Sequence, residues 1–599
     1  MKNSRFDRFS ASSLATICLV ASVSFASQAQ AITDTSLTNQ TISTVIDNVG
    51  GPNTVTKTTT GTATLSGNNT FSGGLFINAG TVLGNTNATA FGAGIIYLGD
   101  TTGSSNTTLQ TNAASGLIYT NPITVVGGNT GVATITSTSQ GGFSGAITLN
   151  SHDLTLNSQT AYGLTLSGGV TGTGNLTINS TGGGGNTTFS TAAVNNVGTI
   201  THSSTAGSNG LVSGGVGSNV NAINQNGTKT LTISTNALTV NSAGTTLNSN
   251  NTGSFSVTSA VAGTGNLVLN ANSTGVIGLA AVNHAGTITN SNSGTGTGTV
   301  TISGVIGTNV TGVTQNSASS TLALTGTNTY AGVFTLGTGT VSVGSVGNGL
   351  VSGNLGAASN AASNLIFDGG TLAITGTGTS DRAFTINAGK TANINVAGSQ
   401  SFAGATGAAT NGSLVKLGAG TLTLTGASTF TGGLTIKAGT MQGNGNAAAF
   451  GNGTITLGDS SGSSNVTLTT NAASGLIYAN PITVAGGNTG IASITSTSQG
   501  GFSGAITLSS HDLTVSSQTA YGLAFSGGVT GIGNLTINST GGGGNTTFST
   551  ASVNNSGTIT HSSTVGSGGV ISGGVGSNVT AINQNSATIG LTIQTTRSP

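Results

Sequence analysis

The residues that could carry chemistry are few and widely spaced along the chain. After the N-terminal segment, the densest charged group combines Asp368, Asp381 and Arg382. Carboxylates with a neighbouring basic residue are the groups that a β-helical lyase or a glycosidase would need. We therefore take these three residues as the candidate charged site. From the sequence as a whole, however, we predict that the protein is not an enzyme.

The five histidines do not add a second site. Two of them lie in a repeated H-D-L sequence, at His152-Asp153 and His511-Asp512. Adjacent residues on a strand point to opposite faces, so neither pair is placed to share one ion or substrate. His202 and His561 both lie in T-H-S-S and are expected to be exposed, and His284 has no carboxylate nearby in the sequence. The sequence contains neither a glycine-rich calcium repeat nor a phosphate-binding loop, and we predict no metal and no cofactor.

The chain that must position these residues has 599 residues and an unusual amino-acid composition. Only 3% of residues are charged, Gly occurs 102 times, and Trp and Glu are absent. Long surface helices are hard to build without Glu and with so few Lys and Arg. Disorder is the alternative, but 35% hydrophobic residues and a net charge of +1 favour a folded chain. The near-neutral charge gives no electrostatic basis for binding nucleic acid or anionic membranes.

The N-terminal segment, 1–31, has the pattern of a secretory signal peptide. A basic start, with Lys2, Arg5 and Arg8, precedes the apolar run Leu14–Phe25. Ala29 and Ala31 form a small-x-small cleavage site, which makes Ile32 the first residue of the mature chain. The single cysteine, Cys18, lies inside this segment, so the mature chain can form no disulfide. No later segment approaches about 20 uninterrupted apolar residues, and we expect no transmembrane helix after signal removal.

A long internal duplication dominates the organisation of the chain. Residues 57–226 reappear at 416–585, shifted by 359 positions without insertion or deletion. In-register copying is typical of solenoids, whose units contact only their neighbours. If one coil takes roughly 20–25 residues, the shift corresponds to about sixteen coils, and its length is compatible with a whole number of coils. The predicted parts are a signal peptide (1–31), a lead-in (32–56), the first copy (57–226), a middle region of diverged repeats (227–415), the second copy (416–585) and a truncated tail (586–599).

Short runs of alternating residues indicate strands. Thr421-Leu422-Thr423-Leu424 has the period of two expected when one face of a strand is buried. Gly, Asn and Ser clusters between such runs supply turns, and stacked Asn and Thr can hydrogen-bond along the axis. We predict an all-β fold, a right-handed parallel β-helix (β-solenoid) built from internal repeats. An outer-membrane barrel is the alternative, but it would need longer strands and aromatic girdles.

One motif occurs three times. The pattern L-x-G-x-x-T-[FY]-x-G stands at Leu65–Gly73, Leu324–Gly332 and Leu424–Gly432, and each copy is followed by Gly-Thr-hydrophobic. This unit resembles the autotransporter-associated β-strand repeat, which marks passenger regions of bacterial autotransporters, including surface antigens of the rickettsial outer-membrane-protein type. The middle copy departs from the pattern, with Val333 where the others have a second glycine.

The resemblance implies an exported β-solenoid passenger at the bacterial cell surface or outer membrane, or secreted, with a structural or adhesive role. Host-cell or extracellular surface ligands would be its partners. It also implies an outer-membrane translocator barrel, which is expected but absent from this chain. With its end at 595–599, we expect that the chain is either a truncated or split product or uses another export route. Two alternatives remain: a β-helical polysaccharide-active enzyme (lyase or glycosidase), or a self-stacking extracellular polymer.

Overall fold

The computed structural model describes residues 32–34, 40–48, 51–112, 116–159, 161–207, 209–292, 295–403, 407–471, 475–518, 520–565 and 568–594. The proposed cleavage residues Ala29 and Ala31 lie outside these ranges, and Ile32 begins strand β1. The chain forms two compact units, residues 1–174 and 175–599. Both units are stacks of short parallel strands, and the described residues form a β-solenoid of about 23 turns.

The first unit contains three parallel ladders of strands. One ladder comprises β1 (Ile32–Asp34), β3 (Thr54–Lys57), β5 (Gly74–Ile77), β7 (Ile96–Leu98), β10 (Ile123–Val125), β13 (Ile147–Asn150) and β16 (Val170–Thr173). The second comprises β2 (Gln40–Ile42), β4 (Thr62–Leu65), β6 (Gly80–Gly84), β8 (Thr107–Thr111), β11 (Ala133–Ser137) and β14 (Leu154–Ser158). The third comprises β9 (Leu117–Tyr119), β12 (Gly141–Phe143) and β15 (Leu164–Leu166).

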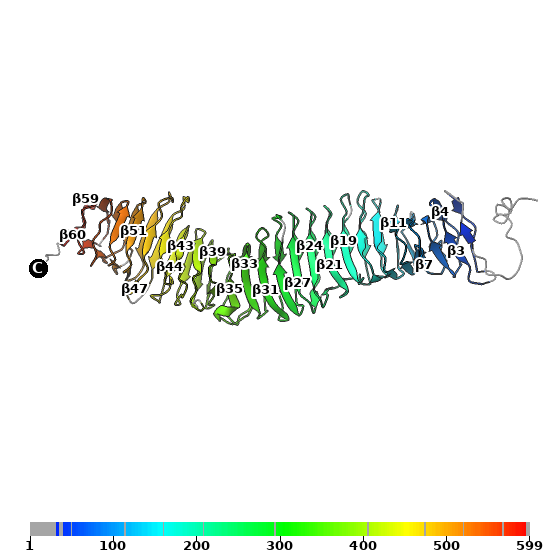
Figure 1. Ribbon diagram of the computed structural model, residues 1–599, viewed down its shortest axis with the longest axis horizontal. Coiled ribbons are helices and arrows are strands. Elements are labelled where there is room, and N and C mark those ends of the chain that lie inside the picture. The colour runs from blue at the N-terminus through cyan, green and yellow to red at the C-terminus, as the bar shows by residue number, and fades with distance from the viewer. Residues whose placement is uncertain are drawn as a thin grey trace, which may run out of the picture. The chain divides into compact units, whose positions relative to one another are not determined.

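The second unit contains four long ladders, which we call L1 to L4. L1 comprises β17 (Leu176–Ile178), β19 (Gly198–His202), β21 (Val220–Gln225), β24 (Thr245–Ser249), β27 (Leu267–Ala271), β29 (Gly286–Asn290), β31 (Val310–Asn316), β33 (Val333–Thr338), β35 (Leu365–Phe367) and β38 (Thr385–Ile386). Figure 1 shows several of these strands, such as β19, β21, β24 and β27, lying side by side.

L2 is the longest of the four. It comprises β18 (Thr187–Phe189), β20 (Gly210–Val212), β22 (Leu231–Ile233), β25 (Phe255–Val257), β28 (Ile277–Leu279), β30 (Val300–Ile302), β32 (Leu322–Leu324), β34 (Thr340–Val343), β36 (Thr371–Ile374), β39 (Thr391–Val396), β41 (Ser413–Leu417), β43 (Leu434–Ile436), β45 (Ile455–Leu457), β48 (Ile482–Val484), β51 (Ile506–Ser509) and β54 (Val529–Ile532).

L3 and L4 occupy the C-terminal part of this unit. L3 comprises β37 (Gly378–Ser380), β40 (Ser399–Phe402), β42 (Thr421–Leu424), β44 (Gly439–Gly443), β46 (Val466–Thr470), β49 (Ala492–Ser496), β52 (Leu513–Ser517), β55 (Leu535–Ile537), β57 (Gly557–His561) and β59 (Val579–Gln584). L4 comprises β47 (Leu476–Tyr478), β50 (Gly500–Phe502), β53 (Leu523–Phe525), β56 (Thr546–Phe548), β58 (Gly569–Ile571) and β60 (Leu591–Ile593). Strands β23 (Leu238–Val240) and β26 (Val261–Gly263) form a separate short pair.

The predicted all-β solenoid is therefore confirmed. Among the described residues, the one helical element is the 3-10 turn η1 (Ala362–Asn364). In the same ranges, we find no helix with the length and apolar character that crossing a membrane requires.

Alternation of side chains builds the interior, as the sequence predicted. In β42 the leucines Leu422 and Leu424 are buried, whereas Thr421 and Thr423 lie on the outer face. Adjacent rungs of such a ladder are about 4.8 Å apart, so inward side chains stack directly on their equivalents in the next coil. The clearest example is the run of buried rings Phe450, Tyr478, Phe502, Phe525 and Phe548, whose neighbouring centroids lie 4.7, 5.5, 6.1 and 4.9 Å apart.

Polar side chains stack along the outer face in the same way. Asn250 donates its side-chain amide to Asn226 Oδ1 at 2.7 Å, and Asn272 donates to Asn250 Oδ1 at 2.7 Å. The predicted hydrogen bonding of Asn along the axis is confirmed by this ladder. Because each amide is both donor and acceptor, such a column can continue for as long as Asn recurs in register.

The triplicated motif corresponds to a single coil of the solenoid. Its first and last strands pair with each other, with register partners Thr62 and Thr81 in the first copy and Thr421 and Thr440 in the third. The middle copy pairs Leu322 with Val341. The two members of every pair differ in number by 19. Each copy of the motif is therefore one complete turn that closes on itself in register, and all three turns have the same length.

Individual motif positions have local physical reasons. The motif aromatic residue is buried in all three copies, at Phe71, Tyr330 and Phe430. A Cβ on the following Gly432 would lie 2.5 Å from the carbonyl oxygen of Asn411 in the preceding coil, so only glycine fits there. Close approach of one coil to the next is thus what the motif glycine permits.

The length of the shift is compatible with a whole number of coils, but the structure shows that the two copies are not related in this way. Strands β18 and β20 of the first copy belong to L2, but their equivalents β56 and β58 in the second copy belong to L4. Likewise β19 and β21 belong to L1, whereas their equivalents β57 and β59 belong to L3. The same sequence therefore lies on a different ladder in each copy.

The physical reason is that coil length varies. Partners within a motif coil differ in number by 19, whereas Val341 and its partner Leu372 differ by 31, because the connection between them carries a long loop. The number of residues in a segment therefore does not give the number of coils that the segment forms. What the duplication preserves is the inward register of each strand, not the side of the solenoid on which the strand lies.

Candidate functional site

The three residues of the candidate charged site have separate local partners. Asp368 follows β35, and its Oδ1 accepts a hydrogen bond from Asn387 Nδ2 at 2.9 Å. Lys390 Nζ lies 3.7 Å from the same Asp368 oxygen, and both side chains are partly exposed. An exposed pair of this kind contributes little to stability and leaves the carboxylate in contact with water.

Arg382 is buried among backbone carbonyls. Only 3% of its surface is exposed. Its Nε donates to Gly347 O at 2.9 Å, and its Nη2 donates to Gly356 O at 2.7 Å and to Asn348 O at 3.3 Å. Burial lowers the pKa of the guanidinium, and this lowering is opposed by Tyr330 and Asp381. The guanidinium therefore binds the backbone of one loop.

Asp381 binds the same loop through different backbone and side-chain atoms. Its Oδ1 accepts a hydrogen bond from Gly349 N at 2.6 Å, and its Oδ2 accepts one from Asn360 Nδ2 at 3.4 Å. Asn354 Oδ1 adds contacts to the amides of Gly344 and Ser345, at 3.1 and 3.2 Å. We call residues 344–361, which connect β34 to η1, the anchored loop. Asp381 and Arg382 lie together at its base, and their contacts are structural.

The tip of the anchored loop carries two exposed aliphatic side chains. Leu350 is 79% exposed and Val351 is 55% exposed. Leu350 has a φ of 61°, in the left-handed region that leucine rarely adopts. Backbone strain of this kind persists only where surrounding contacts hold it, and it is enriched at functional sites. Residues 344–361 contain no charged side chain.

Two of the histidines are more buried than the sequence analysis predicted. His202 and His561 were expected to be exposed, and this prediction is wrong, because both are fully buried. In G-T-I-T-H, alternation puts His202 on the same inward face as Ile200. Its Nδ1 lies 2.7 Å from the Oε1 of Gln225, its register partner in the next coil. His202 is therefore paired with a polar side chain inside the solenoid and is not exposed to solvent.

The H-D-L pairs contact the backbone. The Nδ1 atom of His152 lies 2.7 Å from Asp153 O, and that of His511 lies 2.7 Å from Asp512 O. His284 is buried, with Nε2 3.1 Å from Thr287 O, and desolvation lowers its pKa. Across the ranges that the structure describes, no three His, Cys, Asp or Glu side chains are grouped as metal ligands.

Sequence reasoning missed a fully buried lysine in the third motif copy. Lys416 Nζ donates to the carbonyl oxygens of Leu417, Gly418 and Ala438 at 2.8, 2.7 and 3.1 Å. Burial lowers its pKa from 10.5 to about 8. The alternation in S-L-V-K-L could have revealed it, since Lys416 has the same inward parity as Leu414. Its equivalent in the first copy, Lys57, is buried as well.

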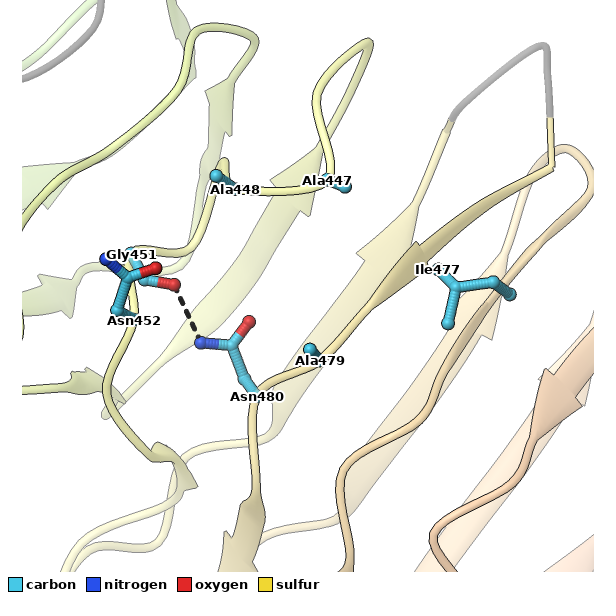
Figure 2. A pocket seen from close by; sticks show the side chains of 7 residues that line it. All are labelled: Ala447, Ala448, Gly451, Asn452, Ile477, Ala479 and Asn480. Atoms are coloured by element: carbon cyan, nitrogen blue, oxygen red, sulfur yellow. Dashed lines mark hydrogen bonds between the residues drawn. The ribbon is translucent and has the colours of Figure 1, made fainter. Parts of the chain in front are cut away.

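A shallow surface hollow was not predicted either. It lies where the turn after β44 meets β47 and the start of β48, and it has a volume of about 290 Å³. Figure 2 shows Ala447 and Ala448 on one side and Ile477 and Ala479 on the other. Asn480 Nδ2 donates to Gly451 O at 2.9 Å and ties the two sides together (Figure 2). We call the hollow lined by Ala447, Ala448, Ile477, Ala479 and Asn480 the alanine hollow.

Comparison with known proteins identifies the motif. The family model described as the passenger-associated-transport-repeat matches residues 55–83, 319–343 and 414–442. These segments contain the three single-coil motifs. Neither the curated proteins nor the solved structures include a match to this chain. The further likeness to rickettsial antigens stays a prediction. The three matches confirm the resemblance that the motif suggested: the chain carries passenger-associated transport repeats on a parallel β-solenoid, as an autotransporter passenger with repeats does.

Proposed function

We propose that this chain is the surface-displayed or released part of an autotransporter-like protein, with a structural or adhesive role and without catalysis. The repeats imply an exported passenger at the cell surface or in the medium. A separate outer-membrane translocator barrel would carry it there. Ligands on host cells or in the extracellular matrix would contact the outer faces of its ladders.

One observation supports this proposal most directly. The charged residues that a β-helical enzyme would use instead hold the chain's own backbone, since Arg382 donates to three carbonyls of the anchored loop. Asp368 is engaged elsewhere, with Asn387 and Lys390. Function would then reside in extended outer faces, where Thr, Ser and Asn recur in register. A β-solenoid can enlarge such a surface by adding whole coils.

Surface display tests the adhesive role. Residues 32–599 would be displayed on a laboratory bacterium through a heterologous translocator, with the same translocator lacking a passenger as the control. We expect more cells to be retained on surfaces coated with fibronectin, collagen or cultured epithelial cells. Retention equal to that of the control on all three surfaces would count against adhesion.

A second assay tests the absence of catalysis. Purified residues 32–599 would be incubated with polygalacturonate, alginate and peptidoglycan, and new reducing ends or unsaturated products would be measured. We expect none above a heat-denatured sample. Turnover that disappears in Asp381→Asn but persists in Asp153→Asn would overturn the proposal and identify an enzyme.

A further inference from the structure

We propose that the pair Asn348-Gly349 in the anchored loop modifies itself, with Asp381 and Arg382 promoting attack of the Gly349 nitrogen on the side-chain amide of Asn348. The attack closes a succinimide ring and releases ammonia, and water then opens the ring to aspartate or isoaspartate. This is a single change of the chain itself. It needs no ligand and no second chain, so it is independent of the proposed adhesive role.

The pair has the residue types that this reaction needs. A glycine after an asparagine leaves the attacking nitrogen unhindered, because it carries no side chain. At Gly349 the packing also demands glycine, since a Cβ there would collide with the backbone nitrogen of Asn360. Asn348 is exposed, so water can reach the ring that forms. The sequence contains six Asn-Gly pairs, which begin at Asn209, Asn226, Asn348, Asn411, Asn444 and Asn452.

The attacking amide is hydrogen-bonded to a carboxylate. Gly349 N donates to Asp381 Oδ1 at 2.6 Å. A backbone nitrogen becomes a nucleophile only when it loses its proton, and a carboxylate at this distance is placed to accept that proton as a general base. Three of the other glycine amides donate to neutral groups instead: Gly210 to Thr230 O, Gly227 to His202 O and Gly412 to Thr410 Oγ1.

Both oxygens on which negative charge develops have a donor in place. Loss of the proton from Gly349 N puts charge on Asn348 O, to which Arg382 Nη2 donates at 3.3 Å. Arg382 is buried, so water screens this interaction less than it would at the surface. Attack then puts charge on Asn348 Oδ1, which accepts a hydrogen bond from Asp381 N at 3.1 Å. Donors already aimed at such oxygens stabilise the transition state.

The bonds and protons of the reaction balance. The N–H bond of Gly349 breaks, a bond from this nitrogen to Asn348 Cγ forms, and Asp381 holds the proton. The bond between Cγ and Nδ2 of Asn348 then breaks, and the proton leaves with that nitrogen as ammonia, which restores the Asp381 carboxylate. Addition of water to either ring carbonyl gives aspartate or isoaspartate. Either product puts a carboxylate into a loop that otherwise contains no charged side chain.

The test follows deamidation of purified residues 32–599 at neutral pH by peptide mass spectrometry, which detects the mass increase when an amide becomes a carboxylate. Digestion under acidic conditions limits conversion during preparation. If the contacts only held the loop, they would restrain the amide and slow the reaction. We expect the opposite: in the folded chain, Asn348 should convert at least about tenfold faster than Asn226, and at least about tenfold faster than Asn348 of the chain unfolded in urea.

A substitution assigns the base. Asp381→Asn keeps an oxygen that can accept the hydrogen bond from Gly349 N but removes the basic carboxylate, so it should slow conversion of Asn348 at least about tenfold. Asp153→Asn, in the first unit, is the matched control and should leave the rate unchanged. Far-UV circular dichroism would verify that both variants are folded, and the comparison of Asn348 with Asn226 needs no variant.

Three results would overturn the proposal. The first is conversion of Asn348 in the folded chain that is no faster than conversion of Asn226. The second is faster conversion of Asn348 in urea than in the folded chain, which would show that the contacts protect the pair. The third is a rate in Asp381→Asn that equals or exceeds the wild-type rate.

Discussion

Lys416 allows a quantitative prediction, because a fully buried amine ties stability to pH. Its pKa falls from 10.5 to about 8 on folding. Well below pH 8 both the folded and the unfolded chain hold the proton, and the destabilisation is fully present. As pH rises from about 8 to 10.5, the folded chain releases the proton while the unfolded chain keeps it, so stability increases. The shift corresponds to about 3 kcal/mol in total, of which about 2.5 kcal/mol is gained between pH 7 and pH 10.

The assay compares urea denaturation of residues 32–599 and of Lys416→Met at both pH values, with far-UV circular dichroism as the signal. Other titrating groups affect both proteins and cancel in the difference. We expect the wild type to gain about 2.5 kcal/mol more than Lys416→Met on going from pH 7 to pH 10. Lys437→Met, which removes the neighbouring exposed lysine, keeps Lys416 and should retain the wild-type gain. An equal gain in Lys416→Met and the wild type would refute the inference that Lys416 is buried and desolvated.

Three further substitutions test the packing. His202→Ala removes the hydrogen bond between His202 Nδ1 and Gln225 Oε1 and opens a cavity, so it should cost about 2–4 kcal/mol in urea denaturation, against less than about 0.5 kcal/mol for His511→Ala. Phe525→Ala should cost about 3–5 kcal/mol by the same assay, whereas Phe525→Leu should cost less than about 1.5 kcal/mol, since Leu166 occupies the equivalent position in the first copy. Arg382→Met should raise the rate of thermolysin cleavage at Leu350 about tenfold or more, while Lys390→Met leaves it unchanged; equal rates would contradict the anchoring role of Arg382.

The sequence predicted what depends on local alternation and missed what depends on coil length. Thr421-Leu422-Thr423-Leu424 indicated its own buried face, because period two is a property of each strand alone. The same alternation rule places His202 and Lys416 on the inward face. The prediction that His202 is exposed was based on the polarity of histidine and not on its position in the alternating pattern. Parity is the stronger guide here, because a buried polar group needs only a partner in the next rung.

The anchored loop shows a different limit. Its anchors Asp381 and Arg382 lie in the following coil, far along the chain from the backbone groups that they hold. Nothing local in that sequence marks which carbonyls a buried arginine will meet. The sequence showed that these two charged residues are adjacent, but it did not show that they hold a loop. The alanine hollow was equally hidden, because it forms where two separate segments meet.

Coil deletion tests the principle that connects these observations. Thr421 pairs with Thr440, so removing residues 421–439 takes out one coil and joins strands that lie on adjacent rungs of L2 and L3. Every later strand then keeps its inward parity, and we expect a folded chain with the circular dichroism of a slightly shorter solenoid. Removing only 421–430 leaves half a coil and moves the next strand off its ladder, which should expose the apolar interior and cause aggregation. If both deletions folded equally well, pairing would not be set by whole coils, and the change of ladder between the two copies would need another cause.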